Sequence, residues 1–205
     1  MAAVVKPSKI DRHGRRFPAS EAHRLDDPAR QEWLPHAEVL RALALHSGET
    51  IADVGAGTGY FSLPLAQAVG PEGKVYAVDA QAEMLSLLKQ KLNRAAITNV
   101  ELIPAEADQT GLLASSCDLF FLANIWHEIE DQHAVLREAQ RVLKKGGRID
   151  ILDWRPDVEP EHGPPLVHRV EPSRAMESLR ATGFVQIAIA NVGRYSWLVQ
   201  GEKLP

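Results

Sequence analysis

Apolar residues follow two alternating patterns along most of the chain. Short runs of consecutive apolar residues are typical of buried strands, and apolar residues spaced three or four positions apart are typical of amphipathic helices. From residue 34 onward these patterns predict helices over 34–45, 60–69, 81–94, 131–143 and 172–182, and strands over 50–54, 74–79, 100–104, 117–123, 148–153, 184–190 and 195–201. This alternation favours an α/β fold, in which helices cover both faces of a mostly parallel sheet.

Two features near the end of the chain refine this picture. The last two strands follow each other around residues 191–194, which predicts an antiparallel hairpin. The helix over 131–143 is expected to end in a basic turn, because Lys144 and Lys145 are followed by Gly146 and Gly147. Cations favour the last turn of a helix, and glycine commonly terminates it.

The composition narrows the class of protein. At 205 residues, 45% of them hydrophobic, the chain suits one globular domain. A net charge of −4 gives no electrostatic case for a nucleic-acid partner, and no apolar run approaches the ~20 residues that span a bilayer. Cys117 is the only cysteine, so an intrachain disulfide and a thiolate zinc cluster are excluded. The first residues lack the apolar segment of a signal peptide, and we expect a cytoplasmic location.

The first 30 residues are the least globular part of the sequence. They contain few apolar residues and five nearby basic ones: Lys6, Lys9, Arg12, Arg15 and Arg16. We expect a basic arm over 1–30 ahead of a single domain over 31–205. The arm is interpreted as solvated, as part of a lid over the substrate, or as a tail that binds a partner.

The segment Ile51–Gly59, with the sequence IADVGAGTG, carries the strongest chemical signal. An apolar strand runs into a turn with glycines at 55, 57 and 59, where the backbone can bend sharply and approach a ligand closely. The helix that follows presents its positive end and free amides, which suit a nucleotide-like ligand. The dinucleotide-binding pattern G-x-G-x-x-G would need its third glycine at Tyr60, so the spacing argues against that ligand.

The glycine pattern also resembles a known motif. With Asp53 two residues before the first glycine, G-x-G-x-G resembles the first motif of the class I S-adenosylmethionine-dependent methyltransferases. The resemblance implies S-adenosylmethionine as the cofactor and a Rossmann-like seven-stranded sheet, with the last strand antiparallel between strands five and six. It further implies that these residues bind the cofactor: Asp53, Gly55, Ala56, Gly57, Thr58, Gly59 and Tyr60.

An acid at the end of the second strand supports a ribose-bearing ligand. Asp79, followed by Ala80, lies where a carboxylate can accept hydrogen bonds from both ribose hydroxyls. The alternative is that Asp79 caps the helix that begins near residue 81. We predict that Asp79 and Ala80 contact the cofactor.

Two more positions follow from the resemblance. After the third strand the family usually has Gly-Asp-Ala, in which the acid accepts a hydrogen bond from the adenine amine. This chain has Glu106 and Ala107 at the positions that match the acid and the alanine. Glu106 is therefore the candidate, Asp108 competes with it, and a plain surface charge is the alternative. Asn124 ends the fourth strand, where its side chain or backbone carbonyl is a candidate for the amino group of the cofactor.

The run that follows deepens the resemblance. Residues 122–156, LANIWHEIEDQHAVLREAQRVLKKGGRIDILDWRP, are similar to the matching block of the UbiE-like, or type 11, methyltransferases, which are best known for methylating quinone precursors. With the glycine turn and Asp79, the resemblance covers about residues 30–200. It implies an enzyme that methylates a small molecule.

Transfer to oxygen or nitrogen usually requires that a proton be removed from the acceptor, and histidine titrates near neutrality. His127 is the first candidate base, and Asp153 at the end of the fifth strand and His168 come next. Each has a structural alternative as a hydrogen-bonded scaffold residue. The proline-rich loop Trp154–Glu171 is expected to form one wall of the acceptor pocket, the alternative being a plain surface connection.

A metal is not expected. The zinc motif H-E-x-x-H fails because Asp131 takes the place of its second histidine. A mononuclear site from Asp131, His133 and Asp153 is the remaining metal hypothesis. The predicted function is methyl transfer from S-adenosylmethionine to a small molecule by in-line displacement. The alternatives are a non-catalytic cofactor-binding partner subunit and an NAD-dependent oxidoreductase, and the oligomeric state is not predictable from these patterns.

Overall fold

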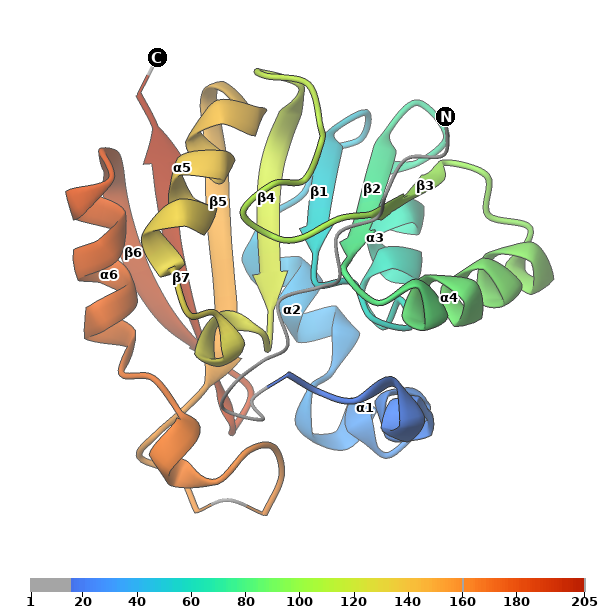
Figure 1. Ribbon diagram of the computed structural model, residues 1–205, viewed down its shortest axis with the longest axis horizontal. Helices are drawn as coiled ribbons and strands as arrows, with labels where there is room; N and C mark the ends of the chain where they lie inside the picture. The colour runs from blue at the N-terminus through green and yellow to red at the C-terminus, as the bar shows by residue number, and fades with distance from the viewer. Residues whose placement is uncertain (1–15, 160, 205) are drawn as a thin grey trace, which may run out of the picture.

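The computed structural model describes residues 16–159 and 161–204, and its centre is a seven-stranded sheet (Figure 1). The strand order is β3-β2-β1-β4-β5-β7-β6, with β7 antiparallel to both of its neighbours. Its strands are β1 (Thr50–Val54), β2 (Lys74–Asp79), β3 (Val100–Pro104), β4 (Cys117–Ala123), β5 (Leu143–Trp154), β6 (Phe184–Val192) and β7 (Ser196–Lys203). The implied Rossmann-like topology, with the last strand between strands five and six, is confirmed.

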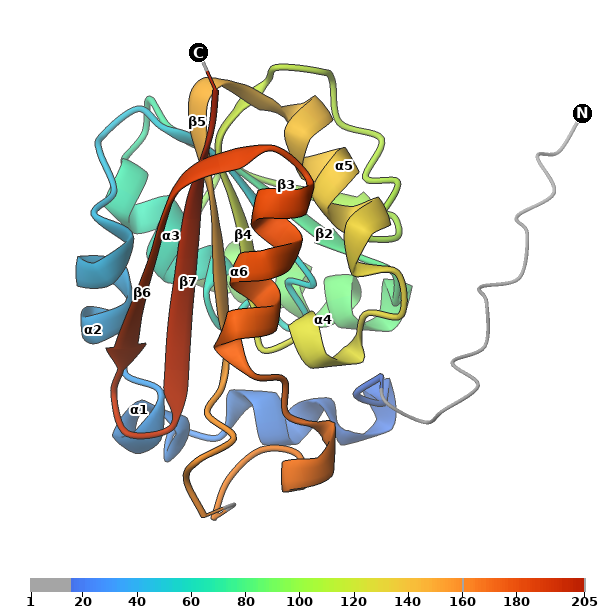
Figure 2. The same ribbon diagram turned by 90° about the vertical axis from the view of Figure 1, so that its left-hand side faces the viewer.

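Helices cover both faces of the sheet, as the alternation predicts (Figure 2). They are α2 (His36–Leu43), α3 (Ser62–Val69), α4 (Ala82–Ala95), α5 (Gln132–Val142) and α6 (Pro172–Ala181). One core lies between the sheet and α2 and α3, and a second lies between the sheet and α5 and α6. Neighbouring residues of β1 point into opposite cores, Ile51 into the first and Ala52 into the second. Burial on both faces explains why the central strands are apolar throughout.

The helix before β5 ends within one residue of the predicted position, but residues 144–147 are not its end: they belong to β5, which begins five residues earlier than predicted. α5 ends at Val142, and Leu143 already has extended backbone angles and pairs with Cys117 of β4. The register then shifts, so that residues 144–147 bulge out before Arg148 pairs with Leu119. Leu143 is fully buried, and its burial outweighs the local preference of the following glycines and lysines for a helix end.

The N-terminal part of the described chain lies across the carboxyl ends of the strands (Figure 1). It contains the 3₁₀ helix η1 (Ala19–Asp26) and the short helix α1 (Arg30–Trp33), neither of which the apolar pattern predicts. Two further 3₁₀ turns, η2 (Trp126–Glu128) and η3 (Leu166–His168), lie at the same edge. Across residues 16–159 and 161–204, the helices are too short or too polar to cross a membrane.

Candidate active site

The glycine turn between β1 and α3 adopts a backbone that favours glycine. Gly55, Gly57 and Gly59 have φ of 75°, 55° and 83°. A Cβ on Gly55 would lie 2.5 Å from the side chain of Ile125, and one on Gly59 would lie 2.2 Å from Leu88. Two of the glycines are therefore required by packing as well as by the turn. Between them, Ala56 is buried and donates its N–H to Val78 over 3.0 Å.

Asp79 ties the end of β2 to this turn. Its Oδ2 accepts from the Gly57 N–H and its Oδ1 from the Gln81 N–H, both over 2.8 Å. Burial raises the pKa of Asp79, although these two hydrogen bonds oppose the rise. The carboxylate thus stands between the glycine turn and the start of α4, with Ala80 beside it. Its predicted contact with a ribose remains a prediction.

Asp53 lies deeper, within β1. Its carboxylate accepts a hydrogen bond of 2.6 Å from Ser62, the first residue of α3. Burial raises its pKa to about 7, against the lowering effect of that hydrogen bond. Asp53 therefore fastens the strand to the helix on either side of the glycine turn, and its direct contact with a cofactor remains a prediction.

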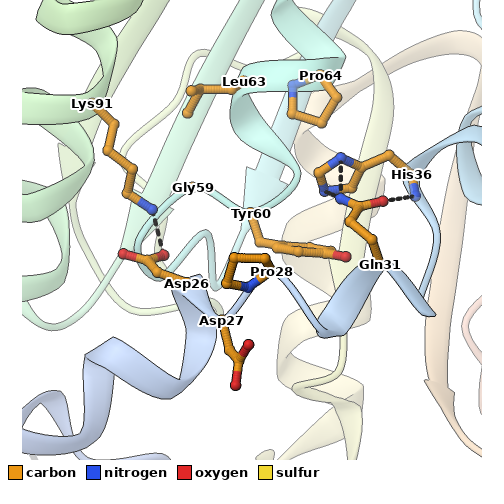
Figure 3. Close-up of a pocket in the computed structure, with 10 residues that line it drawn as sticks. All are labelled: Asp26, Asp27, Pro28, Gln31, His36, Gly59, Tyr60, Leu63, Pro64 and Lys91. Atoms are coloured by element: carbon orange, nitrogen blue, oxygen red, sulfur yellow. Dashed lines mark hydrogen bonds and ion pairs between the residues drawn. The ribbon is translucent and has the colours of Figure 1, made fainter. Parts of the chain in front are cut away.

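Two predicted cofactor contacts in the turn, Thr58 and Tyr60, form hydrogen bonds to the N-terminal part of the chain. The Thr58 hydroxyl donates to Asp26 over 2.6 Å, and the Tyr60 hydroxyl donates to the Leu34 carbonyl over 2.5 Å. The Tyr60 ring also packs 4.2 Å from His36, between ring centroids. Figure 3 shows these rings beside a pocket of about 280 Å³, which Asp26 and Gly59 also line.

The acid after β3 faces the N-terminal segment. Glu106 is half-buried and forms an ion pair of 2.9 Å with Arg16. Asp108, its competitor, is exposed, and Ala107 packs against the core. The carboxyl ends of the strands and the loops around them are here called the crevice. Of the two acids, Glu106 is the one whose charge acts on Asp79 there. Its predicted contact with adenine remains a prediction.

Asn124 is the clearest sign of a ligand at this edge. It follows β4 with a left-handed φ of 57°, and its N–H donates to Leu152 over 2.8 Å. Within the described part of the chain, neither its Oδ1 nor its Nδ2 has a hydrogen-bond partner, although both atoms are buried. Because buried amides are normally satisfied, this side chain suits a polar ligand group.

His127 and Asp153 form a hydrogen-bonded pair at the ends of β4 and β5. The imidazole Nδ1 lies 2.8 Å from Asp153 Oδ1, and the His127 backbone N–H donates to Asp153 Oδ2 over 2.8 Å. Asp153 also accepts from the Trp154 N–H over 2.7 Å. Burial lowers the pKa of His127, but the attraction of Asp153 outweighs it and the pKa is raised. With Nδ1 bound to a carboxylate, Nε2 is the ring atom left to accept a proton.

Glu128 is a site residue that sequence reasoning missed. Its Oε1 lies 3.9 Å from His127 Nε2, and both of its oxygens lie 3.3 Å from the Phe17 N–H. Burial raises the pKa of Glu128 to about 7. The dipeptide His-Glu, which fails the zinc motif and lies in the block that resembles the UbiE-like family, is the sequence signal for this residue.

His168 does not join the His127–Asp153 pair. It lies half-buried in η3, and no hydrogen bond links its side chain to either residue in the described ranges. Its loop is organised instead by Arg169, whose guanidinium donates to four backbone carbonyls, those of Arg155, Val158, His162 and Pro164. The ring of Trp154, from the same region, packs at a tilt of 32° against that of Trp33, with 5.2 Å between ring centroids, so the loop packs against α1.

The proposed metal ligands are not brought together. Asp131 caps α5 by accepting from the Ala134 N–H over 2.9 Å, while Asp153 is paired with His127. Among residues 16–159 and 161–204, no three His, Cys, Asp or Glu side chains are grouped to hold a metal ion. The mononuclear hypothesis with His133 is therefore wrong.

Residues 16–27, here called the strap, cross the crevice and are fastened to it at several points. The Gln81 side chain donates to the Phe17 carbonyl over 3.0 Å and accepts from the Ala19 N–H over 3.2 Å. Asp26 binds Lys91 over 2.5 Å (Figure 3), and it also accepts from Thr58. Residues 16–27 are thus held by several contacts, with exposed side chains among them, such as His23 and Arg24. Residues 1–15, with most of the basic side chains, lie outside the described residues.

Comparison with known proteins identifies the family. A family model described as a methyltransferase domain matches residues 45–189. A demethylmenaquinone methyltransferase from Geobacillus stearothermophilus is 35% identical over 116 residues, which cover 57% of this chain and 50% of that protein. The chain thus spans about half the length of the curated relatives it matches.

Solved structures agree with this assignment. The crystal structure of a SAM-dependent methyltransferase from Aquifex aeolicus has a TM-score of 0.87 and 32% identity, covering 92% of this chain and 100% of that one. Phosphoethanolamine N-methyltransferase 2 from Haemonchus contortus, in complex with S-adenosyl-L-methionine, has a TM-score of 0.69 at 15% identity. The match covers 82% of this chain and 52% of that one. That second likeness concerns the fold alone. With its sheet order, glycine turn and matching family model, the chain belongs to the class I S-adenosylmethionine-dependent methyltransferases.

Proposed function

We propose that this protein transfers the methyl group of S-adenosylmethionine to a hydroxyl-bearing small molecule, with His127 as the base. The observation that carries this proposal is the His127–Asp153 pair at the carboxyl edge of the sheet, next to the glycine turn. In open α/β sheets ligands bind at that edge. The pair is 6% and 1% exposed, so its chemistry is shielded from bulk water.

The crevice fits the cofactor of the family. The turn has no side chain at positions 55, 57 and 59, and Asp79 lies beside it. Among the described residues, two buried polar atoms of Asn124 have no hydrogen-bond partner. We infer that these groups bind the cofactor, together with Glu106 at the adenine end. The cofactor supplies an activated methyl group on a sulfonium, and so the protein needs no further electrophile.

The remaining task of the protein is to hold the acceptor and take its proton. Asp153 fixes the His127 ring through Nδ1, so that Nε2 accepts the proton of an acceptor hydroxyl as the new bond forms. The Asp153 carboxylate then stabilises the charged imidazolium. Glu128, 3.9 Å from Nε2, adds negative charge on the same side once it is ionised, above a pKa of about 7. Alignment of the acceptor depends on the strap and on the loop held by Arg169.

The relatives favour an aromatic acceptor. The demethylmenaquinone methyltransferase from Geobacillus stearothermophilus is named for a quinone precursor, and we infer an acceptor of the quinol or phenol class for this chain. Trp33 stacks on His162 and packs at a tilt against the buried Trp154, and this aromatic cluster is a candidate contact for such an acceptor. His168 remains a proposed contributor to this wall.

Two measurements test the proposal. Calorimetry with S-adenosylhomocysteine and with NAD separates a methyltransferase from an oxidoreductase, and binding of NAD alone contradicts the proposal. A turnover screen over phenols, quinols, amines and thiols then follows methyl transfer. His127→Ala is expected to lower turnover about 10²–10⁴-fold while sparing cofactor affinity. Tight cofactor binding without turnover of any acceptor would favour the non-catalytic partner subunit.

A further inference from the structure

Glu128, the last residue of η2, holds a carboxylate beside the proposed base. Its side chain is 16% exposed, and its Oε1 lies 3.9 Å from His127 Nε2. That distance is too long for a hydrogen bond between the two groups. The imidazole and the carboxylate are therefore two separate acceptors that lie next to each other at the carboxyl ends of the strands.

The carboxylate of Glu128 has room for another hydrogen-bond donor. An ionised carboxylate offers about four acceptor positions on its two oxygens. Within residues 16–159 and 161–204, its hydrogen bonds come from a single group, the Phe17 N–H, whose nitrogen lies 3.3 Å from both oxygens. Because a mostly buried acid normally receives more donors than this, the arrangement favours a donor from a ligand.

One hydroxyl group of an acceptor cannot satisfy both groups, because it has a single proton. In the proposed reaction that proton passes to His127 Nε2, the oxygen binds the methyl group, and the electron pair of the broken C–S bond stays on sulfur. Glu128 Oε1 then needs a second donor from the same molecule. Since Asp153 holds the His127 ring through Nδ1, the second donor must lie beside the first and on the same side of the acceptor.

We propose that Glu128 determines specificity by binding a second hydroxyl next to the one that is methylated, so that the acceptor is a catechol, a ring with hydroxyls on two neighbouring carbons. This inference rests on the proposed function, because it takes the hydroxyl on His127 Nε2 as the methyl acceptor. In a 1,4-quinol the hydroxyls point away from opposite ends of the ring, and only one of them can reach this pair of acceptors. A second methylation of the product would place a methoxy group against Glu128, and we expect the reaction to stop after one methyl group.

The test compares kcat/KM for catechol, 2-methoxyphenol, 1,4-hydroquinone and aniline, without oxygen and above the pKa of Glu128, which is about 7. 2-Methoxyphenol keeps the reacting hydroxyl and replaces the neighbouring donor with a methoxy group. We expect wild-type protein to favour catechol over 2-methoxyphenol and 1,4-hydroquinone about 10–100-fold, the range for a hydrogen bond to a charged group. The product from catechol should be the monomethyl ether.

Glu128→Met keeps an unbranched side chain and removes both acceptor oxygens. We expect it to bring the ratio of kcat/KM for catechol to that for 2-methoxyphenol within about threefold of unity. The ratio is the readout because damage to the strap or to His127 would slow both probes alike. Glu177→Met, the same change at an exposed acid of α6, is the control and should leave the ratio unchanged. If Glu128→Met does not fold, Glu128→Gln keeps an oxygen for the Phe17 N–H and should lower the ratio about fivefold.

Equal turnover of catechol and 2-methoxyphenol by wild-type protein would overturn this inference alone, since methyl transfer to a hydroxyl would stand. A preference for catechol that survives the loss of the Glu128 carboxylate would overturn it in the same way. Turnover of aniline in preference to catechol would contradict the proposed hydroxyl acceptor, because one amine carries two protons and can contact both groups. Turnover of none of the probes would contradict the proposed function itself, and with it the inference that rests on it.

Discussion

At the scale of single residues, the decisive arrangement is a carboxylate that holds one nitrogen of a histidine. Asp153 receives hydrogen bonds from the His127 ring, the His127 backbone and the Trp154 backbone. Three donors thus satisfy the oxygens of this buried carboxylate. The ring is therefore held in one tautomer, and its proton affinity depends on a residue 26 positions away.

Asp153→Asn tests that dependence. The substitution removes the negative charge that raises the pKa of His127, so the acid limb of the kcat/KM profile should move to lower pH. Turnover at neutral pH should fall about 10²–10⁴-fold because the tautomer is no longer fixed. Asp157→Asn, which removes an exposed partner of Arg155 in the following loop, is the control. A variant with an unmoved acid limb would show that His127 is not the base.

The residues of this site can be predicted from the sequence more readily than the hydrogen bonds between them. His127 and Asp153 are recognisable because they lie at or just beyond the ends of predicted strands. Their hydrogen bond is not, since it depends on the parallel pairing of β4 with β5. The burial of Glu128 is not predictable either, because acids are usually solvated, and only the tertiary structure shows it.

At the scale of elements, most helices and strands follow from local apolar patterns. Each predicted strand exists. The central strands are buried on both faces, whereas the edge strands β3 and β6 are only partly buried. The pattern fails where a partner decides the conformation. Leu143 joins β5 because it pairs with Cys117. η1 forms in a polar segment that is held by two hydrogen bonds, from the Ala19 N–H to Gln81 and from the Thr58 hydroxyl to Asp26.

The glycine turn should tolerate no side chain at position 59. Gly59→Ala places a Cβ 2.2 Å from Leu88 at a φ of 83°, and we expect a loss of unfolding free energy. Overpacking together with backbone strain makes that loss about 2–4 kcal/mol by chemical denaturation. Gly111→Ala needs a similar φ of 73° but meets no atom within 4 Å, so it isolates the backbone cost. Equal losses in the two variants would argue against the packing explanation.

β5 carries a buried acid away from the crevice. Burial raises the pKa of Asp150 to about 7, partly offset by Arg148. The folded state therefore binds this proton more tightly than the unfolded state, and stability is lost as pH rises from about 4 to about 7. Asp150→Asn should gain roughly 1–3 kcal/mol at pH 8 and nothing near pH 4.

Urea unfolding of both proteins at these two pH values measures the difference. Glu101→Gln, which removes an exposed acid of β3 that pairs with Lys74, should show no comparable gain at pH 8. A gain for Asp150→Asn that is the same at both pH values would contradict the assigned titration.

At the scale of the whole molecule, the same side chains contact the strap and line the proposed cofactor site. Glu106, Gln81, Thr58 and Glu128 hold residues 16–27 and also line the edge where the cofactor is proposed to bind. Access to the crevice and the order of the strap are therefore expected to change together.

Gln81→Ala removes two hydrogen bonds to the strap backbone, those to Phe17 and Ala19. Amide hydrogen exchange over residues 16–27 should become faster by about 5–30-fold, as expected for the loss of 1–2 kcal/mol of local stability. Gln140→Ala, which removes one bond to the Thr182 carbonyl near α6, is the control and should leave the strap unaffected. Unchanged exchange in Gln81→Ala would mean that the other contacts hold the strap by themselves.

The position of β7 has a consequence for how the protein is made. β7 fills the place between β5 and β6, so seven residues of β5, from Arg148 to Trp154, pair with a strand that is synthesised about 50 residues later. Until then β5 has an open edge of unpaired backbone groups, beside the carboxylate that orients His127. A nascent chain therefore carries an exposed, apolar strand edge, which is a template for aggregation. The His127–Asp153 pair therefore lies on a sheet that is completed only when β7 has been made, and we expect this edge to need shielding during synthesis.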